Sequence, residues 1–552
     1  MLTINNHHRD VLKWYSRPVV HLRRQFREKR FGPVVGAGIS LDFNVPLWGS
    51  LVEEIAKHPK VNGQRVLAGH ANKKSFPFQT ELLFQLFRAN ELKTLTPSLS
   101  SLEKENTISA RWLTLCGEII YANAHGEFGE ALEAHGYFKA LLPLVQNSYL
   151  TVNFNFDDYL ERALNLRKRT KDESNRGYEV VMDPWPQFRR TDSVIYHLHG
   201  FVPFGLMELP VDRLVFSEAE YSKQYVGSRG HDSSFLIGHF ARNTCLLLGC
   251  SLEDELRNVL MRGAQMNPGN YHYYIHYVHD ATSKPDEKEQ ELISATNFNV
   301  YNLITLFLSS SEISALLELI NDSAIADAPL KDLATELGVC IQYNFYMTGP
   351  LGVGKSTTAN NLRNLVVLDE WLEVRPPILG KPWDKLNDEE RDEVDSWIAD
   401  QFYKKNNSLR HIDGAGAIAI VDRPPLVPLV FTEPARRPAK AKSLLDKICP
   451  SRKWSIEPGV VIILTGDTDE LSARVRASGR EDYSADRLKK MQEAIIEIYT
   501  GDGIEKVDTR YLSVREVTKL VAQIVHRQPY KPYNLQAAML AQESAENDPP
   551  KT

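Results

Sequence analysis

Short apolar runs alternate with longer stretches of helical periodicity from about residue 30 to residue 300. The runs are FGPVVGAG (31–38), NSYLTVNF (147–154), DSVIYHLHG (192–200), TCLLLGCS (244–251) and YHYYIHYV (271–278). Strands that are buried on both faces of a parallel sheet form continuous apolar runs, and helices connect such strands. The pattern therefore predicts an α/β domain built on a parallel sheet.

A second series of the same kind begins near residue 341. Between about residues 302 and 340 the pattern is helical, and YNFYMTGPLGVGKSTTANNLRNL (343–365) then predicts a strand, a loop and a helix. The sequence after about residue 528 lacks a wide apolar face and ends in proline and polar residues. We expect a domain at 1–310, a linker region at 311–340, a second α/β domain at 341–528 and a flexible tail at 529–552.

The composition is that of an ordinary globular protein. Of 552 residues, 43% are hydrophobic and 25% are charged, and the formal net charge is −6. Proteins that bind the phosphate backbone of nucleic acids usually carry a basic excess, so nucleic acid is not an expected partner. The N-terminus has no apolar signal region and no run of about 18 apolar residues occurs, so we expect neither secretion nor a membrane span.

The cysteines are few, scattered and odd in number: Cys116, Cys245, Cys250, Cys340 and Cys449. No two of them have the two-residue spacing of a zinc knuckle or a redox motif. We therefore expect a cytoplasmic protein without structural zinc.

Four predicted strands of the first series carry glycine or polar residues just beyond their ends. Because ligands bind outside the carboxyl ends of strands in open α/β sheets, these residues are candidates for one common site. They are Gly36, Ala37, Gly38 and Ser40 after the first run, Asn155 and Asp157 after the second, His199 after the third, and Gly249, Ser251 and Asp254 after the fourth. Glycine amides can approach a pyrophosphate closely, and histidine titrates near neutral pH. His197, inside its strand, is expected to be structural.

The motifs GAGIS, NFD, HG and GCSLED occur in the order found in the sirtuin-like NAD-binding fold, which about half of the chain resembles. The continuation PLWGSL has Trp48 where protein deacetylases usually continue into a Pro-Asp-Phe-Arg segment. In this feature the chain is similar to a divergent branch found in bacterial anti-phage defence proteins. The resemblance implies a Rossmann-like sirtuin fold with NAD⁺ as its substrate.

The same resemblance implies roles for individual residues. Asn155 and His199 correspond to the catalytic asparagine and histidine, and Asp157 lies where the family holds the nicotinamide amide. Asn155 is preferred to Asn153 because three acidic residues then fall in family positions, namely Asp157, Asp158 and Glu161. The residues implied for the cofactor are Gly36, Ala37, Gly38 and Ser40 at the phosphates, and Gly249 and Ser251 at the adenosine ribose.

Sirtuin deacetylases carry a structural zinc module with two cysteine pairs, which this sequence lacks. Loss of that module removes part of the scaffold beside the acyl-lysine groove, so water is the expected acceptor of ADP-ribose. We therefore expect an NAD⁺ glycohydrolase that forms ADP-ribose and nicotinamide. Asn155 would position a water and neutral His199 would accept a proton. An NAD-dependent protein deacylase is an alternative.

GPLGVGKS (349–356) matches the phosphate-binding loop G-x-x-x-x-G-K-[ST] in full, between a predicted strand and helix. The expected ligand is ATP or another nucleotide with Mg²⁺; a degenerate loop that no longer binds nucleotide is the other interpretation. Lys355 would reach the β- and γ-phosphate oxygens and Ser356 would bind Mg²⁺. The other nucleotide-binding candidates of this loop are Gly349, Gly352, Gly354 and Thr357.

Three further strands are predicted after this loop. Asp369 and Glu370 follow the first, Asp422 and Arg423 follow the second, and the third, VVIILTGD, precedes ELSARVRASGRED. The series resembles thymidylate kinase and the deoxynucleoside kinases, which have an Asp-Arg or Glu-Arg pair at this strand end and an arginine-rich lid. That resemblance implies that a set of arginines closes over the phosphates, where a solvated helix face is the other interpretation. These arginines are Arg474, Arg476 and Arg480.

A kinase-like unit joined to an NAD⁺-consuming unit suggests a sensor and an effector. An unrestrained NAD⁺ hydrolase would deplete its own cell, so the resemblance implies abortive infection by NAD⁺ depletion that is switched on by a nucleotide trigger or a phage-derived activator. Coupling between two such sites must be reciprocal. Related effectors assemble, which implies a homo-oligomer. The alternatives are a bifunctional nucleotide salvage enzyme with nucleoside or nucleotide kinase activity and a non-catalytic scaffold.

Overall fold

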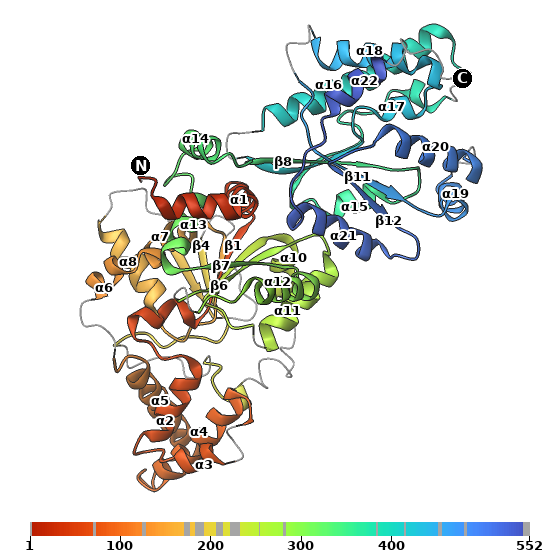
Figure 1. Cartoon of the computed structure of the whole chain (residues 1–552). Coiled ribbons are helices and arrows are strands. Elements are labelled where there is room, and N and C mark those ends of the chain that lie inside the picture. Colours follow the sequence, from red (N-terminus) through yellow and green to blue (C-terminus); the bar gives the residue numbers. More distant parts are fainter. Residues whose placement is uncertain are drawn as a thin grey trace. The chain divides into compact units, whose positions relative to one another are not determined.

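The computed structural model describes most of the chain, namely residues 3–69, 73–123, 128–170, 177–182, 193–205, 214–220, 232–252, 254–279, 283–381, 385–412, 416–450, 455–479 and 483–544. These residues form two compact units, each with its own sheet (Figure 1). Unit 1 consists of Met1–Val11, Gln25–Met266 and Tyr271–Ile325, and unit 2 of Leu12–Arg24, Asn267–Asn270 and Ala326–Thr552. Within the described ranges, no helix is long and apolar enough to cross a membrane.

The N-terminal helix departs from the expected domain boundaries. Helix α1 (Asn6–Arg27) contains Pro18 and has a non-helical residue at Tyr15, as expected where a proline removes a helical hydrogen bond. Its residues 12–24 group with unit 2. Arg17, for example, donates to the carbonyl oxygens of Val525 and Gln528 at 2.9 and 2.6 Å. The expectation that all of residues 1–310 form the first domain is therefore wrong for this segment.

Seven strands among the described residues form the parallel sheet of unit 1, in the order β3-β4-β2-β1-β5-β6-β7. The strands are β1 (Phe31–Val35), β2 (Leu150–Asn153), β3 (Tyr178–Val181), β4 (Ser193–His197), β5 (Thr244–Leu248), β6 (His272–Tyr277) and β7 (Leu303–Leu308). The prediction of a parallel sheet is confirmed. The helical interpretation of residues 302–340 is wrong for β7, because a short apolar run that leads into a helix cannot be distinguished from the helix by periodicity.

Helices cover both faces of this sheet (Figure 1). One face carries α10 (Asp232–Arg242), α11 (Asp254–Met266) and α12 (Glu287–Tyr301), and the other carries α7 (Gly136–Asn147), α8 (Tyr159–Thr170) and α13 (Ser310–Ile320). Side chains of β1, β2, β4 and β5 form a buried apolar cluster with α10 and α11. Helix α13 and the next helix, α14 (Asp327–Leu337), occupy most of the expected linker, and the boundary between units falls between them.

A helical module lies between β1 and β2 in the sequence and was not predicted. It follows the 3-10 helix η1 (Ala37–Phe43) and contains α2 (Trp48–Lys57), α3 (Gln64–Ala68), α4 (Phe76–Leu92), α5 (Ser101–Ile120) and α6 (Phe128–Ala134). Helices α2, α4 and α5 pack against one another beyond the end of the sheet (Figure 1). The side chain of Ser100 and that of Glu103 form a capping box that fixes the start of α5. The first residue of α2, Trp48, connects this module to the candidate site described below.

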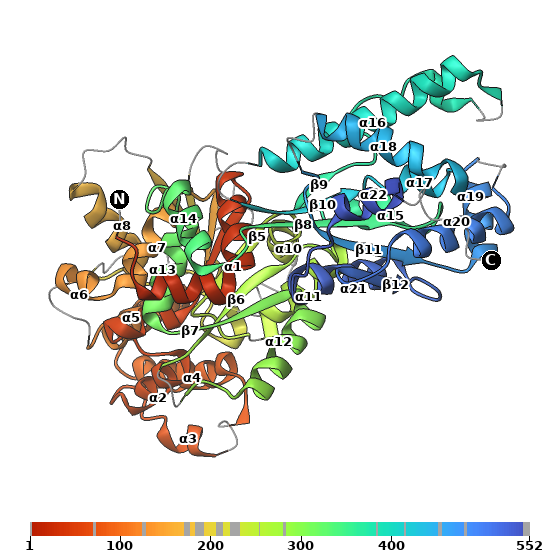
Figure 2. The ribbon, with the colours of Figure 1, turned by 45° about the horizontal axis from the view of Figure 1, so that its top comes forward.

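Five strands among the described residues form the parallel sheet of unit 2, in the order β12-β11-β8-β10-β9. The strands are β8 (Gln342–Thr348), β9 (Val366–Leu368), β10 (Ala417–Asp422), β11 (Val460–Thr465) and β12 (Ile504–Asp508). The helices are α15 (Lys355–Asn361), α16 (Asp388–Arg410), α17 (Val427–Val430), α18 (Arg437–Ile448), α19 (Thr468–Ala477), α20 (Ala485–Ile498), α21 (Val514–His526) and α22 (Leu535–Ser544). Helices α16, α18 and α22 lie on one face of this sheet and α21 lies on the other (Figure 2). The predicted second α/β domain is confirmed.

The C-terminal segment is part of the core of unit 2. Residues 535–544 form α22, which packs against α18. Leu535 and Met539 are fully buried in the same apolar cluster as strands β8, β10 and β11. The expectation of a flexible tail at 529–552 is wrong for residues 529–544, because two apolar residues four positions apart are enough to dock one helical face. Residues 545–552 lie outside the described part of the chain.

Replacing Met539 by alanine tests whether α22 contributes to the stability of unit 2. Removal of a fully buried methionine side chain costs about 2–5 kcal/mol, so Met539→Ala is expected to lower the melting temperature by roughly 5–15 °C. The exposed Ala537→Ser on the same helix is the control and should change it by less than about 2 °C. Equal melting temperatures for the two variants would show that α22 is not part of the folded core.

Candidate functional site

The four predicted polar segments of unit 1 follow four adjacent strands, β4, β2, β1 and β5. In the parallel pair of β2 and β4, Asn153 is in register with His197. Asn155 and His199 each lie two residues beyond this pair. The segments that follow β2 and β4 stay together past the strands, because the amide of Leu198 donates to the Asn153 carbonyl oxygen at 3.1 Å. The structure thus brings Asn155 and His199 to the same edge of the sheet, on neighbouring loops.

Glycines bring the loop after β1 into backbone contact with the loop after β5. The amides of Gly36 and Gly38 donate to the carbonyl oxygens of Leu248 and Gly249 at 3.0 and 2.9 Å. A Cβ atom at Gly36 would lie 2.6 Å from the Gly249 oxygen, and Gly249 itself has a φ of +66°. The amides of two of the four residues expected at the phosphates, Gly36 and Gly38, therefore already have protein partners. These glycines are needed for packing of the two loops, and their contact with a phosphate stays a prediction.

Ser40, Asn155 and Asp157 form one buried polar cluster. The Asn155 side-chain amide donates to Ser40 Oγ at 3.2 Å, and Ser40 also hydrogen-bonds the Asp157 carboxylate. Burial raises the pKa of Asp157 to about 6, although the amide of Tyr159 and the Ser40 hydroxyl both favour its charged form. Asn155 Oδ1 is buried and has no hydrogen-bond partner among the described residues. It is an acceptor that a ligand or a water could use.

The main chain of Asn155 is held on both sides by buried side chains. Its amide donates to Asn153 Oδ1 at 2.9 Å, and its carbonyl oxygen lies 3.2 Å from His197 Nδ1. The other ring nitrogen of His197 lies 2.7 Å from Glu161 Oε1, and His197 is fully buried. The expectation that His197 is structural agrees with these contacts. The pair of His197 and Glu161 was not predicted, because 36 residues separate its members.

Aromatic rings surround His199. Phe154 and Phe156 lie 5.6 and 6.0 Å from its ring centroid, and Trp48 of α2 lies 6.1 Å away. Trp48 also stacks on Phe216 at 6.2 Å. His199 is buried, at 6% exposure. The helical module thus supplies an aromatic wall to the candidate site.

The carboxylate of Asp158 is bound by other groups of the protein. Its carboxylate accepts from the Tyr121 hydroxyl at 3.0 Å and from the amide of Phe204 at 3.0 Å. The Tyr121 hydroxyl also lies 2.6 Å from the carbonyl oxygen of Val202. Tyr121, which the sequence gave no reason to select, therefore fixes α5 to the segment that follows His199. Ser251, which is expected at the adenosine ribose, is exposed after β5. Asp254, the other polar candidate after β5, is the first residue of α11.

The phosphate-binding loop of unit 2 connects β8 to α15, as predicted. Gly349, Gly352 and Gly354 have φ values of 150°, 77° and 101°, a region that favours glycine. Lys355 Nζ donates to the carbonyl oxygens of Gly349 and Pro350 at 2.9 and 3.0 Å. The lysine is thus folded onto its own loop, while Ser356 and Thr357 are exposed at the start of α15.

Ser356 and Asp422 come together although 66 residues separate them. Ser356 Oγ donates to Asp422 Oδ2 at 3.2 Å. Asp422 Oδ1 is buried and has no hydrogen-bond partner among the described residues. Mg²⁺ prefers a few protein oxygens together with phosphate and water oxygens, and this hydroxyl and carboxylate fit that donor set.

Arg423 follows Asp422 in a left-handed conformation, with a φ of +67°. Its amide donates to the Met347 carbonyl oxygen at 2.9 Å. Its guanidinium group pairs with Glu370 at 2.9 Å and lies 5.8 Å from the ring centroid of Trp371. Asp369 instead binds Arg363 on the surface. Of the two acidic residues after β9, only Glu370 therefore contacts the Asp-Arg pair among the described residues.

Two of the three arginines expected in a lid lie on α19, and Arg480 lies outside the described residues. A Cβ atom at Gly352 would lie 3.7 Å from the Cβ atom of Arg474, so α19 lies directly beside the phosphate-binding loop. Arg474 pairs with Glu470 one turn earlier, and Arg476 donates to the Ser472 carbonyl oxygen at 3.4 Å. Arg474 thus lies next to Gly352, and its role in a lid and its contact with phosphate stay predictions.

Comparison with known proteins gives a match to a family model and a match to a solved structure. Residues 149–301 match the family model described as SIR2-like domain, a range that includes Asn155, His199 and Gly249. This match supports a sirtuin-like domain in unit 1. Among solved structures, the chain is similar to thymidylate kinase from Candida albicans, with 16% sequence identity over 35% of this chain and 97% of that one and a TM-score of 0.27. No curated protein sequence matches the chain.

The buried Asp157 carboxyl predicts a pH-dependent stability. Because its folded-state pKa is about 6 and its ordinary value is 3.8, the folded protein loses stability as pH rises from about 4 to 6 and does not regain it above 6. Asp157→Asn should therefore be more stable than the wild type at pH 7.5, by at most about 3 kcal/mol, and nearly equal to it near pH 4. Melting temperatures at both pH values measure this, with the exposed Asp10→Asn as the control. A variant that is less stable than the wild type at pH 7.5 would contradict the conclusion that burial of the Asp157 carboxyl outweighs its hydrogen bonds.

Proposed function

We propose that unit 1 hydrolyses NAD⁺ to ADP-ribose and nicotinamide, with Asn155 and His199 as its catalytic residues. The observation that carries this proposal is the register of β2 with β4, which brings both residues to the carboxyl edge of the sheet beside the β1–β5 loop contact. The order of strands reverses at β1, and ligands of open α/β sheets bind at such a point. The match of residues 149–301 to a SIR2-like domain supports an NAD-related activity in general.

The free acceptor of Asn155 suits the first step of this reaction. The bond between C1′ of the ribose and the nicotinamide nitrogen breaks, its electron pair leaves with nicotinamide, and positive charge develops on the ribose. Asn155 Oδ1, which has no partner among the described residues, can orient a water toward C1′ while its amide group stays bound to Ser40. The water oxygen then bonds to C1′, and His199 accepts the released proton.

Asp157 lies in the same cluster and is proposed to bind the nicotinamide amide. A carboxylate accepts hydrogen bonds from the carboxamide NH₂, and burial strengthens such bonds. The aromatic rings around His199 would exclude bulk water from the ribose, so that a single oriented water is the acceptor. A protein deacylase needs an open groove for acyl-lysine at this place and is the less favoured activity.

For unit 2 we propose binding of a nucleotide with Mg²⁺, on the observation that Ser356 and Asp422 present a hydroxyl and a partly unpaired carboxylate beside the phosphate-binding loop. Lys355 would leave the carbonyl oxygens of Gly349 and Pro350 to bind the β- and γ-phosphates. The same groups would serve phosphoryl transfer in a nucleotide salvage enzyme, which is the second candidate function.

We further propose that nucleotide binding to unit 2 controls NAD⁺ consumption by unit 1, in an anti-phage response that depletes NAD⁺. An NAD⁺ hydrolase that is always active would deplete its own cell, so its activity must be held off until infection. If the nucleotide changes the affinity of unit 1 for NAD⁺, linkage requires that NAD⁺ change the affinity of unit 2 for the nucleotide by the same factor. A nucleotide or a phage-derived factor would be the trigger.

Replacing either catalytic residue tests the hydrolase proposal. His199→Ala and Asn155→Ala are each expected to lower NAD⁺ turnover by about 100-fold or more, because they remove general-base catalysis or the oriented water. The exposed His7→Ala is the control and should turn over NAD⁺ at the wild-type rate. Mass spectrometry of nicotinamide and ADP-ribose in H₂¹⁸O, with the protein at high concentration, measures the reaction and shows incorporation of one solvent oxygen.

Full activity of His199→Ala would contradict the assignment of the base. Formation of acyl-ADP-ribose from an acetyl-lysine peptide, with no hydrolysis of NAD⁺ alone, would establish the deacylase instead.

Titration of NAD⁺ turnover with nucleotides tests the sensor proposal on the full chain. At least one nucleoside or deoxynucleoside triphosphate with Mg²⁺ should change NAD⁺ turnover by about 5-fold or more. Lys355→Ala should abolish that response without changing basal NAD⁺ turnover. The exposed Asn360→Ala on α15 should respond as the wild type does. No response to any nucleotide would remove the sensor, and steady formation of ADP in the presence of nucleoside acceptors would favour the salvage enzyme.

A further inference from the structure

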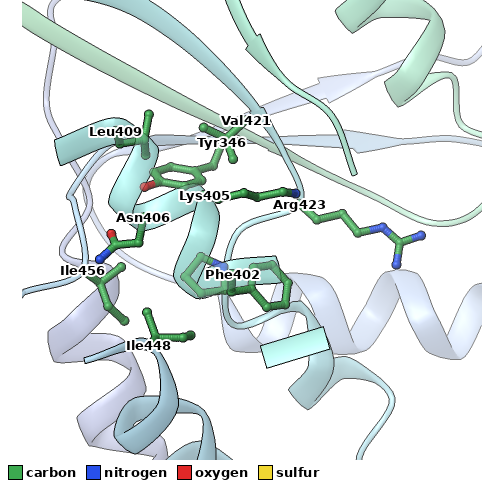
Figure 3. Close-up of a pocket in the computed structure, with 10 residues that line it drawn as sticks. Tyr346, Phe402, Lys405, Asn406, Leu409, Val421, Arg423, Ile448 and Ile456 are labelled. Carbon is green, nitrogen blue, oxygen red and sulfur yellow. The ribbon is translucent and has the colours of Figure 1, made fainter. Parts of the chain in front are cut away.

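Lys405 on α16 is buried at the carboxyl end of β10, at 2% exposure. Its side chain runs from α16 toward the segment that follows β10 and contains Arg423, and it lies between Tyr346 and Phe402 (Figure 3). Its Nζ atom donates to the main-chain oxygen of Asp422 at 2.5 Å. A small cavity of about 10 Å³, with room for about one water, adjoins these side chains.

A buried ammonium group without an ion pair is costly for the folded state. Among the described residues, no carboxylate forms an ion pair with Lys405, and the ring centroid of Phe402 lies 5.6 Å from its Nζ atom. Burial accordingly lowers the pKa of Lys405 to about 8. A methionine would fill the same space without this cost. Buried ionisable groups with shifted pKa values cluster at functional sites, and Lys405 adjoins the candidate nucleotide site.

The oxygen that Lys405 binds belongs to the peptide between Asp422 and Arg423. The N–H of this same peptide donates to the Met347 carbonyl oxygen at 2.9 Å. The peptide is thus held at both ends, by a side chain of α16 and by the main chain of β8. This matters because Arg423 has a φ of +67°, which is unfavourable for a residue with a side chain and persists only where the surroundings enforce it.

The conformation of this peptide determines where two functional side chains lie. Asp422 Oδ2 is 3.2 Å from Ser356 Oγ, and the Arg423 guanidinium group is paired with Glu370. If the peptide rotated, the carboxylate and the guanidinium group could not both keep these positions.

We propose that Lys405 is a positioning residue of the nucleotide site, which holds the Asp422–Arg423 peptide in its left-handed turn and thereby aims the Asp422 carboxylate at the metal beside Ser356. This inference rests on the proposed binding of a nucleotide with Mg²⁺ to unit 2. It assigns Lys405 an action through Asp422, with no contact to the nucleotide.

The test compares binding of the non-hydrolysable ATP analogue AMP-PNP in the presence and absence of Mg²⁺, by calorimetry on the full chain. Lys405→Met keeps most of the unbranched side chain and removes the donor, and it should reduce the enhancement of affinity by Mg²⁺ by about 10-fold. Lys404→Met is the matched control, because Lys404 makes ion pairs with Glu373 and Asp400 at the surface. It should leave the enhancement unchanged.

Asp422→Asn and the double variant Lys405→Met/Asp422→Asn complete the cycle. If Lys405 acts through Asp422, the double variant loses no more of the Mg²⁺ enhancement than Asp422→Asn alone. Additive losses, or a Lys405→Met variant that melts at a lower temperature and keeps the full enhancement, would overturn the inference and leave Lys405 a residue of the interior. An Asp422→Asn variant with full enhancement would instead overturn the proposed metal site, and the inference with it.

Discussion

The parallel pairing of β2 with β4 is the constraint on which the candidate NAD⁺ site depends. Because Asn153 is in register with His197, the chain delivers Asn155 and His199 to one edge of the sheet, and a shift by one residue would turn one of them to the opposite face. The backbone contact between Gly36 and Gly249 then closes the neighbouring side of the same edge. Side chains from outside the sheet complete the site: Ser40 binds Asn155, and Trp48 lies against His199.

In both units, hydrogen bonds hold the peptide group of a candidate site residue. In unit 1, Asn153 and His197 bind the amide and the carbonyl oxygen of Asn155, and Glu161 holds His197. In unit 2, the peptide before Arg423 is bound at both ends in the same manner. Each arrangement leaves a buried, titratable group with a shifted pKa, raised at Asp157 and lowered at Lys405, because burial disfavours the charged form of either.

Much of this architecture could be predicted from the sequence, for a physical reason. Strands buried on both faces are continuous apolar runs, and the phosphate-binding loop needs glycines at fixed positions, so β1, β2, β4, β5 and β8 and the loop 349–354 were all visible. The helical module, β7 and α22 were not predicted, because their existence depends on packing: Leu535 and Met539 form a core helix only where α18 accepts them. The same limit applies to the sites. Asn155 and His199 could be selected because they follow predicted strands. The roles of Glu161, Tyr121 and Lys405 depend on partners far along the chain. The role of Gly36 and Gly38 in packing became visible only with their contact to the loop of Gly249.

A crystal structure of His199→Ala with NAD⁺ tests the central claim most directly, since this variant is expected to bind the dinucleotide and to consume it slowly. The account predicts the nicotinamide ribose at the carboxyl edge of β2 and β4, with an ordered water between Asn155 Oδ1 and C1′ and the nicotinamide amide at Asp157. A dinucleotide bound elsewhere, or a ribose that Asn155 cannot reach even through one water, would contradict it.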